Sequence, residues 1–293
     1  MPIAGRALPS GELARPVGAP LGRSGGARSC IATGCRRSTR HRWRCGRMTW
    51  PAHATHCGRR RGRLMPVISF ASPKGGVGKS TSALLLATGL TAAGASVTVI
   101  DGDPNRTVEG WATSAEHPGF KWLRLPSDDE IIDAIEEAAE KTQFVIVDLE
   151  GTANLAMARA ISRTDLVIIP LQASPVDARQ ASRAIKMVMA QAKELRRDIS
   201  YRMLFTRVNP AIATRDEKEI RSQFQEASIP ALKVALNERA AFRAMFTHYQ
   251  SLWDLHDEAV NGLGKAKANA TEFVREVTQT IRDLRAAGQG QAA

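Results

Sequence analysis

Cysteine is absent from residues 65–293, and no part of the chain has a long uninterrupted run of apolar residues. A membrane-spanning helix needs about 18 or more apolar residues in succession. Iron–sulfur clusters need thiolate ligands, which residues 65–293 cannot supply. These two absences argue against a membrane-spanning protein and against an iron–sulfur carrier.

Acidic residues are nearly absent from residues 1–64, which hold 14 Arg, no Lys and the single acid Glu12, for a charge of +13. The whole chain has a formal charge of +12, so residues 65–293 carry −1. The basicity therefore belongs to the first 64 residues. It does not mark the remainder of the chain as a nucleic-acid binder.

Residues 1–64 also lack Asp, Asn, Gln, Phe and Tyr, and their apolar residues follow neither a helical nor a strand period. We therefore predict that they form a disordered, Arg-rich leader. The segment is open to three interpretations: a zinc site, a targeting peptide, or sequence upstream of a translation start at Met65. We favour the start at Met65, because the missing amino acids are largely those with AT-rich codons. The zinc ligands would come from Cys30, Cys35, Cys45, Cys57, His41, His53 and His56.

Apolar strands and helices alternate from Met65 onward. Strands at 67–71 and 96–100 flank a glycine-rich loop and a helix at 82–93, which is a βαβ unit. We expect further strands at 144–147, 165–170, 201–205 and 231–235, and helices that begin at 127–130 or cover 176–195, 214–226 and 255–286. Residues 65–293 are therefore predicted to form one α/β domain. Its fold is that of a P-loop NTPase, with three layers and a mostly parallel sheet covered by helices on both faces.

The glycine-rich loop reads Pro-Lys-Gly-Gly-Val-Gly-Lys-Ser at residues 73–80. It departs from the ordinary P-loop pattern at Pro73, where that pattern has glycine. Its glycines let backbone N–H groups face phosphate oxygens, Lys79 adds positive charge, and the Ser80 hydroxyl can bind Mg²⁺. The loop predicts ATP and Mg²⁺ as cofactors. The nucleotide-binding residues would be Lys74, Gly75, Gly76, Val77, Gly78, Lys79, Ser80 and Thr81.

Acidic residues follow two of the predicted strands. Asp101 and Asp103 come after strand 96–100, and Asp148 comes after strand 144–147. The carboxyl ends of parallel strands face the crevice where ligands bind. We expect Asp148 and Ser80 to hold the metal ion and Asp101 to fix its own loop.

Lys74, directly before two glycines, is the signature of the deviant Walker A family, the ParA/MinD-type ATPases. The chain resembles the small, ParF-like partition members of this family over nearly all of residues 65–293, including 101–105, 162–177 and 237–243. The resemblance implies a sandwich dimer formed on ATP, in which Lys74 reaches the partner's nucleotide. It also implies that Asp103 positions or deprotonates the attacking water. The predicted catalytic residues are thus Lys74, Lys79 and Asp103.

The resemblance implies an ATP hydrolase that is weak alone and stimulated by a partner. Such a protein binds DNA nonspecifically and drives plasmid or chromosome partition with a small centromere-binding protein of the ParB or ParG kind. We expect it in the cytoplasm, on the nucleoid and not on a membrane. Two alternatives stay open: an ATPase that positions a protein cargo such as carboxysomes, chemoreceptors or cellulose machinery, and a MinD-like, membrane-associated division regulator. The second needs a clearly basic membrane-binding helix, and residues 271–286 balance their arginines with acids.

DNA binding by a nearly neutral domain needs a local basic cluster. On the predicted helix 176–195, spacings of seven and four place Lys186, Lys193 and Arg197 along one face, with Arg196 beside them. This cluster is the predicted DNA surface. For recognition of the adenine edge, the candidate is Asn209, after strand 201–205.

Overall fold

The structure is a computed structural model that describes residues 65–125, 127–149, 155–258 and 260–290. The leader predicted for residues 1–64, with its three interpretations, lies outside the described residues.

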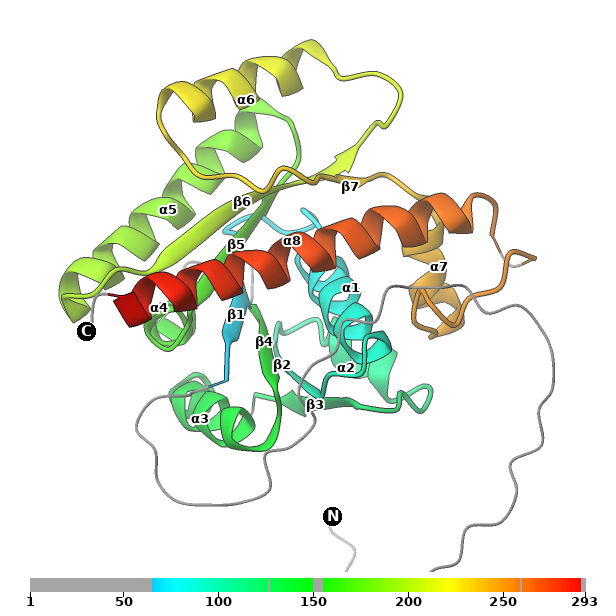
Figure 1. Cartoon of the computed structure of the whole chain (residues 1–293), viewed down its shortest axis with the longest axis horizontal. Coiled ribbons are helices and arrows are strands. Elements are labelled where there is room, and N and C mark those ends of the chain that lie inside the picture. Colours follow the sequence, from blue (N-terminus) through cyan, green and yellow to red (C-terminus); the bar gives the residue numbers. More distant parts are fainter. Residues whose placement is uncertain (1–64, 126, 150–154, 259, 291–293) are drawn as a thin grey trace, which may run out of the picture. The chain divides into compact units, whose positions relative to one another are not determined.

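Seven strands form one parallel sheet in the order β3-β2-β4-β1-β5-β6-β7 (Figure 1). Its central strand β1 is buried along its whole length and pairs with β4 and β5. A parallel strand buried on both faces is expected to be largely apolar, and β1 is, with Ser69 as its one polar residue. The strands are β1 Val67–Phe70, β2 Val97–Gly102, β3 Phe120–Arg124, β4 Phe144–Leu149, β5 Leu166–Leu171, β6 Ser200–Val208 and β7 Leu236–Asn237.

Helices connect successive strands and cover both faces of the sheet (Figure 1). One apolar cluster joins the sheet to α1, α2, α7 and α8, and a second joins its other face to α3, α4, α5 and α6. The predicted three-layer α/β fold is confirmed. The helices are α1 Lys79–Ala92, α2 Thr107–Ala112, α3 Ile131–Lys141, α4 Leu155–Ser162, α5 Pro175–Leu195, α6 Arg215–Glu226, α7 Ala240–His248 and α8 Leu263–Gly290, with a 3₁₀ turn η1 at Asp128–Glu130.

The C-terminal helix α8 packs on α1 through an approach that only a glycine permits. A Cβ atom at Gly89 of α1 would lie 2.6 Å from Val274 Cγ2 and 2.7 Å from Trp253 Cη2. The apolar side of α8, including Phe273 and Val277, is buried. Within the described ranges, no helix is both long and apolar enough to cross a bilayer.

Two predicted boundaries are wrong for identifiable reasons. Residues 231–235 pair with β6 only through an isolated parallel bridge between Ala231 and Met203. The pairing does not continue as a strand, because the N–H groups of Lys233 and Val234 donate to the Glu276 carboxylate of α8 at 2.7 and 2.8 Å. The last strand is instead β7, beyond this segment. The C-terminal helix begins at Leu263 and not at 255, since Gly262 has φ +75°, which a helix interior cannot accommodate.

The start of α3 also differs from its predicted capping arrangement. Ser127 makes no cap to the backbone, and its hydroxyl donates to the Glu130 carboxylate at 3.0 Å. The intervening residues form η1, and α3 follows at Ile131. Four elements were not predicted at all: α2, β3, α4 and α7.

Candidate functional site

The glycine-rich loop lies between β1 and α1, at the carboxyl edge of the sheet. Gly76 and Gly78 have φ +75° and +95°, in the left-handed region that glycine adopts without strain. A Cβ atom at Gly75 or Gly76 would meet nothing within 4 Å, so the loop is open on that side. Helix α1 begins directly after it with no side-chain cap and no acid in its first turn. Its positive end is therefore free to face an anion.

A cavity of about 540 Å³ lies over this loop. Lys79, Ser80 and Thr81 line it from the start of α1, and Asp103 lines it from the loop after β2. A second cavity of about 530 Å³ continues from it and shares Gly78, Thr81, Arg207 and Phe246 with the first. The remaining residues of the second cavity are Ser82, Thr206, Leu236, Asn237, Glu238, Arg239, Phe242 and Arg243.

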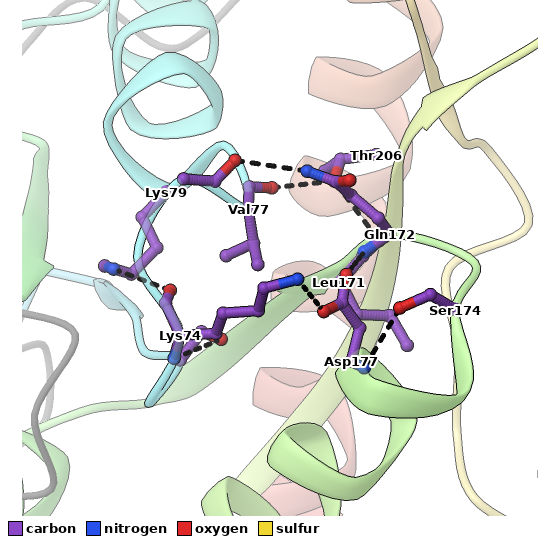
Figure 2. Close-up of polar contacts among 10 residues, drawn as sticks. Lys74, Val77, Lys79, Leu171, Gln172, Ser174, Asp177 and Thr206 are labelled. Atoms are coloured by element: carbon purple, nitrogen blue, oxygen red, sulfur yellow. Dashed lines mark hydrogen bonds and ion pairs between the residues drawn. The ribbon is translucent and has the colours of Figure 1, made fainter.

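Side chains from the ends of β5 and β6 hold the loop in place (Figure 2). The Thr206 hydroxyl donates to Val77 O at 2.7 Å, and the Gln172 side-chain amide donates to Gly76 O at 3.2 Å. The Lys79 ammonium donates to Lys74 O at 3.3 Å, within the loop itself. The loop is thus joined to two neighbouring strands before any ligand is present. Thr206 and Gln172 were not predicted as site residues.

Lys74 is paired with Asp177 at the start of α5 (Figure 2). The ammonium contacts Asp177 Oδ1, while Oδ2 accepts the Gln172 N–H at 3.1 Å. The Lys74 side chain is 36% exposed and that of Asp177 is 1% exposed. Lys74 does not line the cavity over the loop, although both of its neighbours, Pro73 and Gly75, do.

Three predicted acids meet near the cavity with different surroundings. Asp101 lies beside Asp148 in the paired strands β2 and β4. Its two oxygens accept the N–H groups of Asp103 at 3.1 Å and Glu109 at 2.9 Å, so Asp101 fixes the backbone after β2. Burial raises the pKa of Asp101. Asp103 is half-buried, and its Oδ1 accepts the backbone and side-chain N–H groups of Asn105, both at 2.8 Å.

Asp148 is fully buried and neither of its carboxylate oxygens has a hydrogen-bond partner among the described residues. Burial raises its pKa to about 7, and the charges of Asp101 and Asp103 add to this shift. The nearby Ser80 hydroxyl and Lys79 ammonium oppose the shift, without a normal hydrogen bond to either oxygen. A buried carboxylate without a partner, next to a serine hydroxyl that lines the cavity, fits a site for a hard cation such as Mg²⁺. No group of three or more His, Cys, Asp or Glu side chains in the described residues could hold a metal, so water or phosphate oxygens would complete the coordination of Mg²⁺ there.

Asn209, the candidate for recognition of the adenine edge, lies in the loop after β6. Its side chain accepts the Ala211 N–H at 2.9 Å and lines neither cavity. Arg207 and Phe246 line both cavities but were missed. Arg207 follows the buried part of β6 with φ +52°, and Phe246 comes from the unpredicted helix α7, so neither carries a local sequence signal.

The structure keeps two of the four residues of the predicted basic cluster, Lys186 and Lys193, on the helix. Helix α5 ends at Leu195, where Arg196 turns into a left-handed conformation with φ +52°. Arg197 therefore leaves the helix face, and its guanidinium donates to Ser162 O at 2.8 Å. Lys186 and Lys193 remain exposed on α5.

Two further arginines, Arg179 and Arg183, lie on the same exposed face of α5. Together with Lys186 and Lys193 they follow spacings of four, three and seven, which align them along one side of the helix. We call these four residues the α5 basic stripe.

The comparisons with known proteins agree with this geometry. The sequence model described as VirC1 protein matches residues 65–288. A protein named ParA from Rhizobium radiobacter is 33% identical over 222 residues, which cover 74% of this chain and all of that protein. A second relative, maintenance of carboxysome distribution protein A from Gloeobacter kilaueensis, is 26% identical over 185 residues. The aligned residues cover 61% of this chain and 82% of that protein.

Among solved structures, a putative plasmid partition protein from Borrelia burgdorferi bound to AMPPNP superposes with a TM-score of 0.53. It is 17% identical and covers 71% of this chain and 98% of its own, so it shows a shared fold. The family match and the Rhizobium relative extend over nearly the whole described part of the chain. The chain therefore belongs to the VirC1 family of ParA/MinD-type ATPases.

Proposed function

We propose that this chain binds Mg·ATP in the cavity over residues 73–81 and hydrolyses it. The observation that carries the proposal is the buried, unpartnered Asp148 carboxylate next to Ser80, beneath an open glycine loop. Lys79 supplies positive charge at the start of α1, and the free N–H groups of that helix favour phosphate oxygens. Bound Mg²⁺ supplies a positive centre for the phosphates, with Ser80 and Asp148 as its protein contacts.

Asp103 would position or deprotonate the attacking water. It lines the cavity, it is half-buried, and Asn105 fixes one of its oxygens through two hydrogen bonds. The other oxygen is free to accept a proton or a hydrogen bond from an attacking water. Asp101, whose oxygens are both occupied by backbone N–H groups, holds the segment that carries Asp103.

The base of the nucleotide would occupy the adjoining cavity. Phe242 and Phe246 give that cavity apolar surface, and Arg207 lies at the junction of the two cavities. An aromatic side chain beside a planar base stabilises it by stacking. This assignment replaces Asn209 as the base-recognition residue.

The sharpest test separates binding from turnover. Lys79→Ala is expected to lose ATP binding, measured by calorimetry, because the phosphate charge is no longer balanced. Asp103→Ala is expected to bind ATP like the parent and to lose roughly 100-fold in kcat, the usual range for a positioned proton acceptor. Equal hydrolysis by Asp103→Ala and the parent would remove Asp103 from the mechanism.

We further propose an ATP-dependent homodimer that binds DNA nonspecifically and drives plasmid or chromosome partition with a small centromere-binding partner. The ParA relative and the likeness to a putative plasmid partition protein support this role. The α5 basic stripe supplies the DNA contact, because its four cations share one exposed face of the helix. The protein would then reside in the cytoplasm, on the nucleoid.

A salt series on the complete chain tests the DNA contact. Each phosphate contact contributes about 0.9 to the slope of log affinity against log salt. The variant Lys186→Glu with Lys193→Glu is expected to flatten this slope by about 2 in the presence of ATP. The matched control is Arg215→Glu with Lys218→Glu, on exposed positions of α6. If both double variants bind duplex DNA alike, the stripe is not the contact.

Positioning of a protein cargo is the second candidate function. It is favoured by the relative from Gloeobacter kilaueensis, whose name assigns it to carboxysome distribution. A fluorescent fusion distinguishes the two roles, since partition requires that the protein follow a DNA locus and cargo positioning that it follow a protein assembly. A MinD-like membrane role is less well supported, because the apolar side of α8 is buried against the domain.

A further inference from the structure

Asp177 is a buried carboxylate that joins the glycine loop to α5. Lys74 Nζ contacts its Oδ1, and the Gln172 N–H donates to its Oδ2 at 3.1 Å. The Asp177 N–H in turn donates to the Ser174 hydroxyl at 3.2 Å. With only 1% of its side chain exposed, Asp177 is held on three sides, and Lys74 is its only cationic partner among the described residues.

The two lysines of the loop are divided between two places (Figure 2). Lys79 lines the phosphate cavity, whereas Lys74 extends away from it to Asp177. In the single chain, therefore, the charge of Lys74 is not available to the nucleotide bound by the same chain. Since 36% of its side chain remains exposed, Lys74 can still be withdrawn toward solvent or toward a second molecule.

Asp177 keeps other stabilising interactions when Lys74 moves away. It is the third residue of a 21-residue helix whose N-cap is Ser174, a position where the helix dipole stabilises an anion. The Gln172 N–H remains as a donor to Oδ2 after Lys74 has left. The helix dipole and the Gln172 N–H therefore offset part of the cost of separating Lys74 from Asp177.

We propose that Asp177 is the positioning residue for Lys74: it holds the lysine in the monomer and releases it to the nucleotide of a second copy of the chain. The inference rests on the proposed ATP-dependent dimer. It adds that dimerisation must open two Lys74–Asp177 pairs, one in each copy. The ion pair in the monomer therefore opposes dimerisation. Gln172, whose N–H donates to Asp177, also contacts Gly76 O, so the ion pair is connected to the phosphate loop.

Asp177→Asn tests the proposal, because asparagine keeps an oxygen for the Gln172 N–H and removes the charge that holds Lys74. A partly exposed ion pair contributes up to about 1 kcal/mol, or about fivefold, so opening two pairs should weaken the parent dimer by up to about 25-fold. We expect Asp177→Asn to dimerise more tightly than the parent on AMPPNP by up to this factor, measured by analytical ultracentrifugation of the complete chain. Asp177→Ser, also uncharged, gives the same reading should the Asn variant fail to fold. A dimer no tighter than the parent's in the variant that folds would overturn the proposal.

The matched control is Glu217→Gln. Glu217 is also the third residue of a helix with a hydroxyl N-cap and is also buried in an ion pair, with Arg221. It does not touch the phosphate loop, so Glu217→Gln is expected to dimerise like the parent. Tighter dimerisation by both variants would show a general effect of removing buried charge, and it would overturn the specific role of Asp177.

Lys74→Ala separates this inference from the proposed function. If Lys74→Ala dimerises on AMPPNP like the parent, the lysine-dependent dimer itself is wrong. If Lys74→Ala stays monomeric and the Asp177 variants gain nothing, only the role of Asp177 is wrong. The double variant Lys74→Ala with Asp177→Asn is expected to stay as monomeric as Lys74→Ala, since the charge at Asp177 acts through the lysine.

Discussion

Helices α5 and α6 begin with the same local arrangement. In each, a hydroxyl N-cap accepts the N–H of the third helical residue: Ser174 from Asp177 at 3.2 Å, and Thr214 from Glu217 at 3.1 Å. In each, that third residue is a buried acid in an ion pair. By sequence pattern alone the two helix starts are equivalent.

The two acids differ in where their cations come from. The partner of Glu217 is Arg221, one turn later in the same helix, with its guanidinium 4.0 Å from the centre of the Phe205 ring. The partner of Asp177 is Lys74, 103 residues earlier, in the phosphate loop. The Glu217–Arg221 pair lies within one helix and packs on the core, and so it stabilises the fold. The Lys74–Asp177 pair joins a helix to a ligand-binding loop, and so it can respond to the ligand.

A third buried acid extends the comparison, because Asp148 has no partner at all among the described residues. Burial raises its pKa from 3.8 to about 7, so in the folded protein it keeps a proton that the unfolded chain releases near pH 4. Its contribution to stability is therefore full below pH 4 and is lost as the pH rises toward 7. The loss is on the order of 4 kcal/mol, from about three pKa units.

Asp148→Asn isolates this contribution from those of other titrating groups. The difference in unfolding free energy, parent minus variant, is expected to fall between pH 4 and pH 7 in the absence of nucleotide. Mg²⁺ with ADP should stabilise the parent more at pH 8 than at pH 6, because the metal needs the ionised carboxylate. A pH-independent difference in the unfolding series would show that Asp148 is ionised throughout.

The central strands of the sheet could be predicted from the sequence and its edges could not. Strands β1, β4 and β5 are covered on both faces, which favours the largely apolar sequences found at 67–71, 144–147 and 165–170. The edge strand β3 pairs only with β2 and is half-buried or exposed along its length, so its residues need not be apolar. Segment 231–235 begins to pair with β6 at Ala231, but the N–H groups of Lys233 and Val234 donate to Glu276 of α8, 40 or more residues away in sequence.

The second prediction contrasts the two cations. Lys74→Ala is expected to lower kcat by about 100-fold or more, the usual effect of removing a group that stabilises developing charge. Arg221→Ala is expected to keep the parent kcat and to lower the unfolding free energy by about 1–2 kcal/mol, since it loses an ion pair and a contact with an aromatic ring. Steady-state ATPase assays and thermal unfolding of both variants provide the measurement. A large fall in kcat for Arg221→Ala would break the distinction between the two helix starts.

The residues of the candidate site, like the two ion pairs, fall into those that are close together in sequence and those that are far apart. The residues of the loop itself, such as Lys79 and Ser80, are contiguous, so their shared role can be read from spacing. The Glu217–Arg221 pair is equally local, with partners four residues apart. Thr206, Gln172 and Asp177 reach the loop because β5 pairs with β1 and β6 lies on the far side of β5. No local sequence pattern predicts these contacts.

The smallest expected effect comes from the two N-caps. Ser174→Ala and Thr214→Ala each remove one hydrogen bond to the first turn of a helix, which costs about 1 kcal/mol. In a domain of this size, each loss lowers the melting temperature by roughly 2–4 °C. The two variants are therefore expected to unfold at nearly the same temperature, as the matching local geometry requires.

Dimerisation should tell these two caps apart. Ser174 orients Asp177, so its loss loosens the carboxylate that holds Lys74. We expect Ser174→Ala to tighten the AMPPNP-dependent dimer by about twofold to threefold, equivalent to roughly half a kcal/mol, and Thr214→Ala to leave it unchanged. Sedimentation of both variants at one nucleotide concentration measures the difference. Equal stability with unequal dimerisation would show that the same capping motif stabilises both helices and regulates through only one, because only α5 holds a residue of the phosphate loop. Equal dimerisation would confine both caps to a structural role.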